Sequence, residues 1–196
     1  MSFQAVLMAA AALLGFATGY RRFNRPSIFK RVKKPRELRT HQARMTNFSA
    51  RKPPPLLHQL SVYVAGDTHF DDTFTVRDST GNFLGECGAK AAVHASFAEL
   101  PAAPGIVVWA FDKDALATDS AVFLTEDAYN TPDVHDALGQ KATVFLAEPD
   151  MTALLDMRSL RLVARVLDVQ LRPGDGPATF AQFAVEIAVW KKQDSK

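Results

Sequence analysis

Cysteine is almost absent from this chain, and so are the residue clusters that build metal sites. The single cysteine, Cys87, cannot form an internal disulfide, so the sequence excludes a disulfide-stapled scaffold and favours a reducing compartment. The five histidines show none of the usual metal-ligand spacings, and the chain has no glycine-rich phosphate loop. We therefore expect no cofactor, no small-molecule substrate and no enzymatic activity.

Acidic residues are scarce in the first part of the chain. Residues 1–55 contain one acid, Glu37, and 12 lysines and arginines, a net charge of +11. Residues 56–196 contain 20 acids and 11 bases, a net charge of −9. Such an asymmetry predicts two segments with different surroundings. Because the larger segment is acidic, no nucleic-acid partner is expected.

Only one long apolar run occurs, Phe3–Tyr20, and it is uncharged throughout. As a helix it would extend roughly 27 Å, close to the thickness of a bilayer's hydrocarbon core. We predict a transmembrane helix over residues 1–20. Eight bases follow within residues 21–36, so the positive-inside rule places the N-terminus outside and the C-terminal domain in the cytoplasm. The predicted location is an inner (cytoplasmic) membrane, with the mitochondrial inner membrane and a matrix-side domain as the alternative.

Two cleaved targeting segments are the alternatives to a membrane span. A secretory signal peptide needs positive charges before its apolar stretch, and residues 1–4 carry only the terminal amine. A mitochondrial transit peptide is also rich in arginine and poor in acids, but it mixes basic and apolar residues around one helix, whereas here they form separate blocks.

Small residues recur along the apolar run at intervals of three or four, which lets a second helix approach closely in lipid. A plain alanine-rich anchor is the alternative. Tyr20 would anchor the span at the membrane interface, and the arginines after it would hold anionic head groups. The predicted interface with the membrane and with partner subunits consists of Ala12, Gly15, Gly19, Tyr20, Arg21, Arg22 and Arg25.

Residues 21–55 show no sustained hydrophobic period. Pro26, Pro35 and the run of prolines at 53–55 interrupt any helix, so we predict an extended, basic juxtamembrane linker. This linker could bind anionic lipid head groups, lie along the acidic face of a partner protein, or only set the membrane topology.

Short runs of Val, Phe, Thr and Leu, separated by turn residues, fill residues 56–196. They predict an all-β domain, a two-layer β-sandwich of immunoglobulin-like or jelly-roll type. A helical insert is expected only at 127–138, with Pro132 at its first position after Thr131. The predicted strands are 60–65, 73–77, 83–89, 106–111, 121–125, 143–147, 160–171 and 180–190.

Three local patterns refine this prediction. Gly81 or Asn82 should take a positive φ in the hairpin loop at 78–82. The apolar phase of strand 160–171 changes after Val166, which indicates a β-bulge. Strand 180–190 alternates between apolar and mixed positions, so one face should lie on the core and the other on solvent or a partner.

Two candidate chemical sites lack the partner residues that their chemistry would need. The loop at 66–72 contains one imidazole, of His69, and three carboxylates, but no second histidine lies nearby, so a polar turn is favoured over a metal site. Cys87 lies in an apolar strand without a partner histidine, so a buried structural thiol is favoured over a nucleophile.

A third candidate is acidic. The stretch from Val107 ends in Asp112 and Asp114, with Asp119 shortly after. It resembles, over about 15 residues, the strand and calcium loop of the calcium-dependent lipid-binding sandwiches found in synaptotagmin and protein kinase C, where alternate carboxylates converge on one cation. The resemblance implies a calcium site at Asp112, Asp114 and Asp119, and a calcium- or lipid-responsive membrane module. A solvated acidic hairpin is the alternative.

The favoured interpretation is a membrane-anchored binding protein. A single span, a basic collar and an acidic β domain without a catalytic motif indicate an accessory or stabilising subunit of a larger membrane complex, of respiratory or photosynthetic type. Its expected partners are the other subunits of that complex and a bilayer with anionic head groups.

Overall fold

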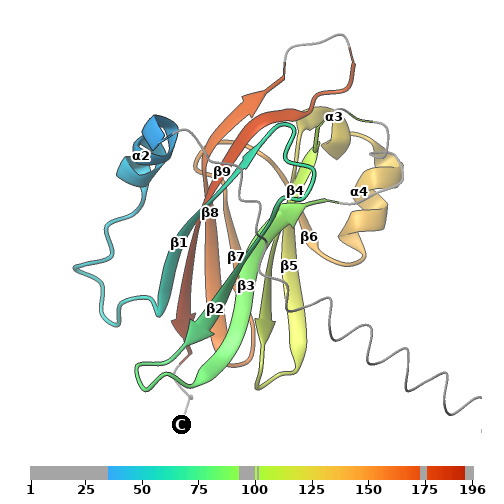
Figure 1. Ribbon diagram of the computed structural model, residues 1–196. Coiled ribbons are helices and arrows are strands. Elements are labelled where there is room, and N and C mark those ends of the chain that lie inside the picture. Colours follow the sequence, from blue (N-terminus) through green and yellow to red (C-terminus); the bar gives the residue numbers. More distant parts are fainter. Residues whose placement is uncertain (1–34, 93–99, 101, 173–175, 193–196) are drawn as a thin grey trace, which may run out of the picture. The chain divides into compact units, whose positions relative to one another are not determined.

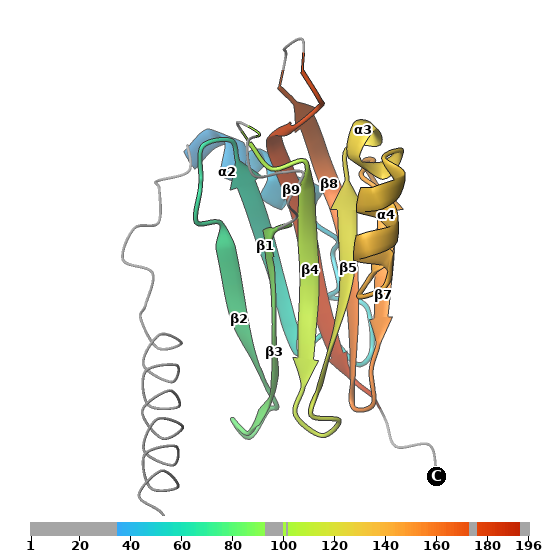
Figure 2. The same ribbon diagram turned by 90° about the vertical axis from the view of Figure 1, so that its right-hand side faces the viewer.

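Two β-sheets stand face to face in this protein (Figures 1 and 2). The structure, a computed structural model, describes residues 35–92, 100, 102–172 and 176–192. The first sheet has the order β1 (Leu57–Val64), β9 (Phe180–Lys191), β8 (Leu160–Leu171), β7 (Thr152–Asp156). The second has the order β2 (Asp71–Arg77), β3 (Phe83–Ala91), β4 (Gly105–Asp112), β5 (Ala117–Leu124), β6 (Thr143–Leu146).

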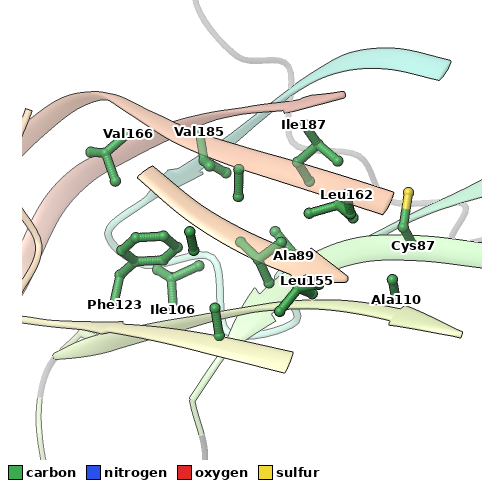
Figure 3. Close-up of a cluster of buried hydrophobic side chains, with 14 of the residues drawn as sticks. Cys87, Ala89, Ile106, Ala110, Phe123, Leu155, Leu162, Val166, Val185 and Ile187 are labelled. Carbon is green, nitrogen blue, oxygen red and sulfur yellow. The ribbon is translucent and has the colours of Figure 1, made fainter. Parts of the chain in front are cut away.

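The main core fills the space between the two sheets (Figure 3). Its side chains come from alternate positions of both sheets, because successive residues of a strand point to opposite faces. Phe123 of β5 lies 5.6 Å from Phe145 and 5.8 Å from Phe183 of the opposite sheet, measured between ring centroids. The prediction of an all-β domain with two packed layers is therefore confirmed in this coarse form.

The order of the strands is largely consecutive. β2 to β5 form an antiparallel meander, β7 to β9 form another, and β1 pairs with β9. β6 pairs in parallel with β5 after a helical crossover, which a parallel connection requires. This order differs from the Greek-key arrangement of immunoglobulin-like and jelly-roll domains. The two-layer architecture, and not that strand order, is what the structure shares with the sequence-based expectation.

All eight predicted strands are present, and one further strand, β7, was missed. It has five residues, of which Ala153 and Leu155 enter the core. The predicted bulge in β8 is confirmed, since the register with β9 shifts between Val166 and Asp168. Gly81 has the positive φ expected of the hairpin loop, 87°.

The helical insert forms two short helices, α3 (Glu126–Tyr129) and α4 (Pro132–Gly139). They pack on the outer face of the second sheet through Ala128 and Val134, which contact Val122 and Leu124 of β5. Pro132 occupies the first turn as predicted. The hydroxyl of Thr131 donates to the carbonyl of Asp127 and does not cap α4.

The outer face of the first sheet is also covered, and here the sequence-based prediction was wrong. Residues 35–44, expected to be extended, form helix α2 (Pro35–Arg44). Pro35 begins this helix because a proline at the first position loses no intrahelical hydrogen bond. Leu38 and Met45, spaced for one helix face, pack on Val62, Leu167 and Ala184. We call residues 35–56, comprising α2 and the irregular segment after it, the strap.

Backbone contacts group the strap with the sandwich. The compact unit that contains the sandwich begins at Pro35 and so includes residues 35–55, which the sequence assigned to a linker. Within the described ranges, no helix has both the length and the apolar character to cross a bilayer. The predicted span at 1–20 lies outside those ranges, as do all the predicted interface residues: Ala12, Gly15, Gly19, Tyr20, Arg21, Arg22 and Arg25.

Candidate functional site

The most unusual side-chain arrangement lies between the strap and β9. Gln182, Glu186 and Trp190 are four residues apart on β9, so all three point to its outer face. Each is nevertheless buried, with 6%, 2% and 7% of its surface exposed. This is the face for which the sequence predicted solvent or a partner, and the occupant is the chain's own strap. In chain order the strap contacts Gln182, then Glu186, then Trp190.

The first contact joins α2 to the end of the sheet. His41, which is 4% exposed, places its Nε2 atom 2.6 Å from the side-chain amide of Gln182. Its Nδ1 atom is buried and has no hydrogen-bond partner in the described part of the chain. Nearby, Arg44 Nη1 lies 3.4 Å from Asp168 Oδ1. This end of the strap is therefore held by packing and by one short polar contact.

The second contact is a buried carboxylate with four donors. Glu186 Oε1 accepts from the backbone N–H of Thr46 (2.7 Å) and from His58 Nε2 (2.6 Å). Glu186 Oε2 accepts from the hydroxyl of Thr46 (2.9 Å) and from Arg165 Nε (3.0 Å). Arg165 also donates to the carbonyl of Arg44 at 2.8 Å. The cluster thus ties the turn after α2 to three strands, β1, β8 and β9.

The electrostatics of Glu186 follow from these contacts. Burial by itself raises the pKa of the carboxyl group, but the donors from His58, Thr46 and Arg165 together outweigh burial and lower the pKa below its ordinary value. Glu186 is therefore ionised at neutral pH. Its charge is balanced by Arg165, and a displaced strap would remove the two donors of Thr46 from this carboxylate.

The strap is expected to loosen in acid. Because the pKa of Glu186 is lowered by folding, its ionised form adds stability above the ordinary glutamate pKa of 4.5, and this contribution is lost as the pH falls through the lower pKa of the folded state. Urea unfolding should therefore show a fall in stability in this acidic range. The fall should be smaller in Glu186→Gln, whose stability at neutral pH is already reduced. Equal pH dependence of stability in the parent protein and in Glu186→Gln would contradict the lowered pKa of Glu186.

The third contact is aromatic. Phe48 packs edge-on against Trp190, with ring centroids 5.2 Å apart, and against His58 at 4.9 Å. The guanidinium carbon of Arg51 lies 4.6 Å from the centre of the Trp190 ring, within the range of a cation–π contact. Trp190 Nε1 donates to the carbonyl of Pro53 at 3.2 Å. The distal half of the strap is therefore also held on the sheet, through Trp190.

Two of the three acidic residues of the predicted calcium loop, Asp112 and Asp119, use their carboxylates for hydrogen bonds within the protein, and Asp114 forms hydrogen bonds through its backbone. Asp112 is fully buried and accepts from the backbone N–H and hydroxyl of Ser159, at 2.6 and 2.7 Å, and from the N–H of Leu160. Asp119 is exposed and accepts from the N–H of Ser120. Among the described residues, no group of three or more His, Cys, Asp or Glu side chains is placed to hold a metal ion.

Asp112 fastens one sheet to the other. It ends β4, and Ser159 lies in the turn between β7 and β8 of the opposite sheet. Burial by itself raises the pKa of Asp112, but the bonds from Ser159 and from the N–H groups of Asp114 and Ala115 outweigh burial and lower the pKa below its ordinary value. Its carboxylate oxygens are thus occupied by donors from both sides of the sandwich.

We expect Asp112→Asn to destabilise the domain by about 2 kcal/mol, because an amide cannot accept all of these bonds and buried N–H groups lose their acceptor. Chemical denaturation would measure the loss. Asp114→Asn is the control, since Asp114 is exposed and in its bonds with Asp112 and Arg158 uses only its backbone. Similar small effects in both variants would contradict this role for Asp112.

The two remaining candidates from the sequence have ordinary surroundings. In the loop at 66–72, Asp67 accepts from the N–H of His69, and Asp72 accepts from the hydroxyl of Ser61 at 2.7 Å. Cys87 is fully buried in the core (Figure 3). Burial, assisted by the charge of Glu86, raises the pKa of its thiol to about 12, so the reactive thiolate is not formed at neutral pH.

Comparison with known proteins does not assign the chain to a family. Neither a family model nor a curated protein nor a solved structure matches the chain. The functional argument therefore depends on the residues themselves. Among them, sequence reasoning missed the strap, although Leu38, His41 and Met45 have the spacing of one helix face.

Proposed function

We propose that this protein is a single-pass, membrane-anchored accessory subunit of a larger membrane complex, of respiratory or photosynthetic type, and that it acts by binding and not by catalysis. Residues 1–20 would cross the bilayer with the N-terminus outside. The sandwich would lie on the cytoplasmic side of an inner membrane, or on the matrix side of the mitochondrial inner membrane. Its partners would be neighbouring spans and anionic lipid head groups.

The observation that supports this proposal is the strap. Residues 35–56 are not a free linker, because they are held on β9 by contacts to Gln182, Glu186 and Trp190. The strap is therefore part of the folded domain. A domain whose folded part begins at residue 35 would stay close to whatever binds the preceding basic segment, which suits a stabilising subunit.

The predicted partner contacts are carried by the small residues of the span. Gly15 and Gly19 would let a neighbouring helix approach, Tyr20 would lie at the membrane interface, and the arginines at 21, 22 and 25 would contact head groups. These assignments rest on the sequence pattern.

Membrane fractionation and native electrophoresis test the proposal. The full chain should resist extraction by alkaline carbonate and, after gentle solubilisation, should migrate with a large assembly. A chain beginning at Pro35 should be released into the soluble fraction. Migration of the full chain as a lone monomer would contradict the accessory role.

A matched pair of variants tests the helix face. Gly15→Leu with Gly19→Leu should leave the chain in the membrane but remove it from the assembly, because the larger side chains prevent close approach. Ala10→Leu with Ala17→Leu makes the same kind of change on the other side of the predicted helix, given 3.6 residues per turn. This control should still migrate with the assembly.

A further inference from the structure

The two outer faces of the sandwich carry opposite charges. The strap, residues 35–56, contains five lysines and arginines and one acid, a net charge of +4. Residues 126–139, which form α3 and α4, contain four acids and no lysine or arginine, a net charge of −4. α2 covers the outer face of the first sheet and α3 and α4 cover that of the second, so the two charges lie on opposite sides of the domain (Figure 1).

Part of the strap's positive charge is available for an external partner. Arg39, Arg51 and Lys52 are exposed, and in the described ranges neither Arg39 nor Lys52 forms an ion pair with a carboxylate. Arg51 is in contact with Trp190, which neutralises no charge. No acid occurs between residues 38 and 56. The exposed surface of this segment is therefore cationic or neutral throughout.

We propose that the outer face of the strap lies flat on an anionic phospholipid bilayer, so that α2 and the first sheet face the membrane and α3 and α4 face away from it. This inference rests on the proposed membrane anchoring and adds an orientation to it. Cytoplasmic leaflets carry anionic lipids that attract clusters of lysine and arginine next to a span. The acidic helices would be repelled by the same surface.

The length of the connecting chain is compatible with this orientation but does not impose it. The 15 residue steps from Tyr20 to Pro35 reach at most about 50 Å when extended. A strand of 12 residues such as β9 has a similar length, roughly 40 Å. The tether therefore keeps the domain at the membrane while leaving either face free to approach it. The positive charge of the strap is what favours this face over the acidic face of α3 and α4 at an anionic membrane.

Site-specific labelling of the full chain in lipid nanodiscs tests the orientation. Gln42→Cys places a label on α2, and Gln140→Cys places one just after α4; both glutamines are exposed. Cys87 is fully buried, so a maleimide fluorophore reacts only with the introduced thiol. In discs containing phosphatidylserine, nitroxide-labelled head groups should quench the label at 42 strongly and the label at 140 weakly. Discs of phosphatidylcholine alone should reduce the difference.

Charge variants show whether the contact is electrostatic. Arg39→Gln with Lys52→Gln should reduce the preference for the strap-down orientation roughly 25-fold, at about fivefold per cation. Lys90→Gln with Lys141→Gln removes two exposed cations outside the strap and should leave the quenching pattern unchanged. Salt should weaken the quenching at 42 in the parent chain.

The outcomes separate this inference from the proposed function. If the chain is retained in the discs but the two labels are quenched equally, the orientation is refuted and the anchor stands. If the strap label is near the head groups regardless of lipid charge, the electrostatic contact is refuted. If the label at residue 42 is shielded only in native membranes that contain other proteins, an acidic partner protein covers the strap and the lipid contact is refuted. If the chain does not enter the discs, both proposals fail.

Discussion

A chain that begins at Leu56 is expected to aggregate or to unfold at a much lower denaturant concentration than one that begins at Pro35. Without the strap, Val62, Leu167 and Trp190 on the outer face of the first sheet become exposed. At about 1.5–3 kcal/mol for each large apolar side chain, their exposure removes on the order of 5 kcal/mol of hydrophobic stabilisation. That loss is comparable to the whole stability of a marginal domain.

The comparison needs only two purified fragments, 35–196 and 56–196, examined by sedimentation and by urea unfolding. A third fragment that lacks residues 193–196 is the control for shortening the chain, and it should behave like fragment 35–196. Equal midpoints and equal solubility for fragments 35–196 and 56–196 would show that the strap is dispensable, and the argument from its contacts would then fail.

Glu186→Ala is expected to lower the stability of the domain by about 3 kcal/mol. The substitution removes the shared acceptor of Thr46, His58 and Arg165, and it leaves the Arg165 charge without its buried partner. Breaking a buried ion pair costs about 3–5 kcal/mol, and the lower end applies because the Arg165 side chain is 27% exposed. Hydrogen exchange should also become faster at residues 38–46, where the strap is released.

Asp156→Ala is the matched control for Glu186→Ala. Asp156 also accepts from an arginine, Arg161 Nε, at 3.0 Å, but both side chains are nearly half exposed. Exposed ion pairs contribute little to stability, so this variant should unfold almost like the parent protein and should leave exchange in the strap unchanged. If both variants had the same small effect, the buried cluster would not be what holds the strap.

These predictions bear directly on the proposed function. If the strap is part of the folded domain, then residues 21–34 are the whole length of chain between the predicted span and the sandwich. So short a connection keeps the domain close to the membrane, and the charges of the strap then favour one face over the other. If the strap detached readily, the domain would instead be tethered by a longer chain and could not stabilise a fixed neighbour.

Much of the sandwich could be predicted because its signals are local. The alternation of apolar residues in Phe180–Lys191 defines a strand by itself, and the change of phase after Val166 marks the bulge. Gly81 marks its hairpin turn in the same way. Strand β7 was not predicted because its five residues contain too few alternations of apolar and polar side chains to indicate a strand.

The calcium hypothesis shows where such local reasoning ends. Asp112 and Asp114 are spaced like cation ligands, and nothing near them in the sequence distinguishes a ligand from a structural carboxylate. The distinction comes from Ser159, which lies 47 positions further along the chain and whose N–H and hydroxyl both donate to Asp112. A spacing rule cannot detect a partner that folding brings from the other sheet.

The amino-acid sequence by itself determined the all-β class of this domain, eight of the nine described strands, the separation of basic and acidic segments, and the apolar run, because each depends on composition or on neighbours within a few positions. Only the tertiary structure decided that residues 35–56 belong to the domain and that Glu186 is buried, since the Thr46 donors lie 140 positions away from it. The alternation of polar residues in β9 indicates which side chains leave the core, but it contains no information about which distant segment covers them.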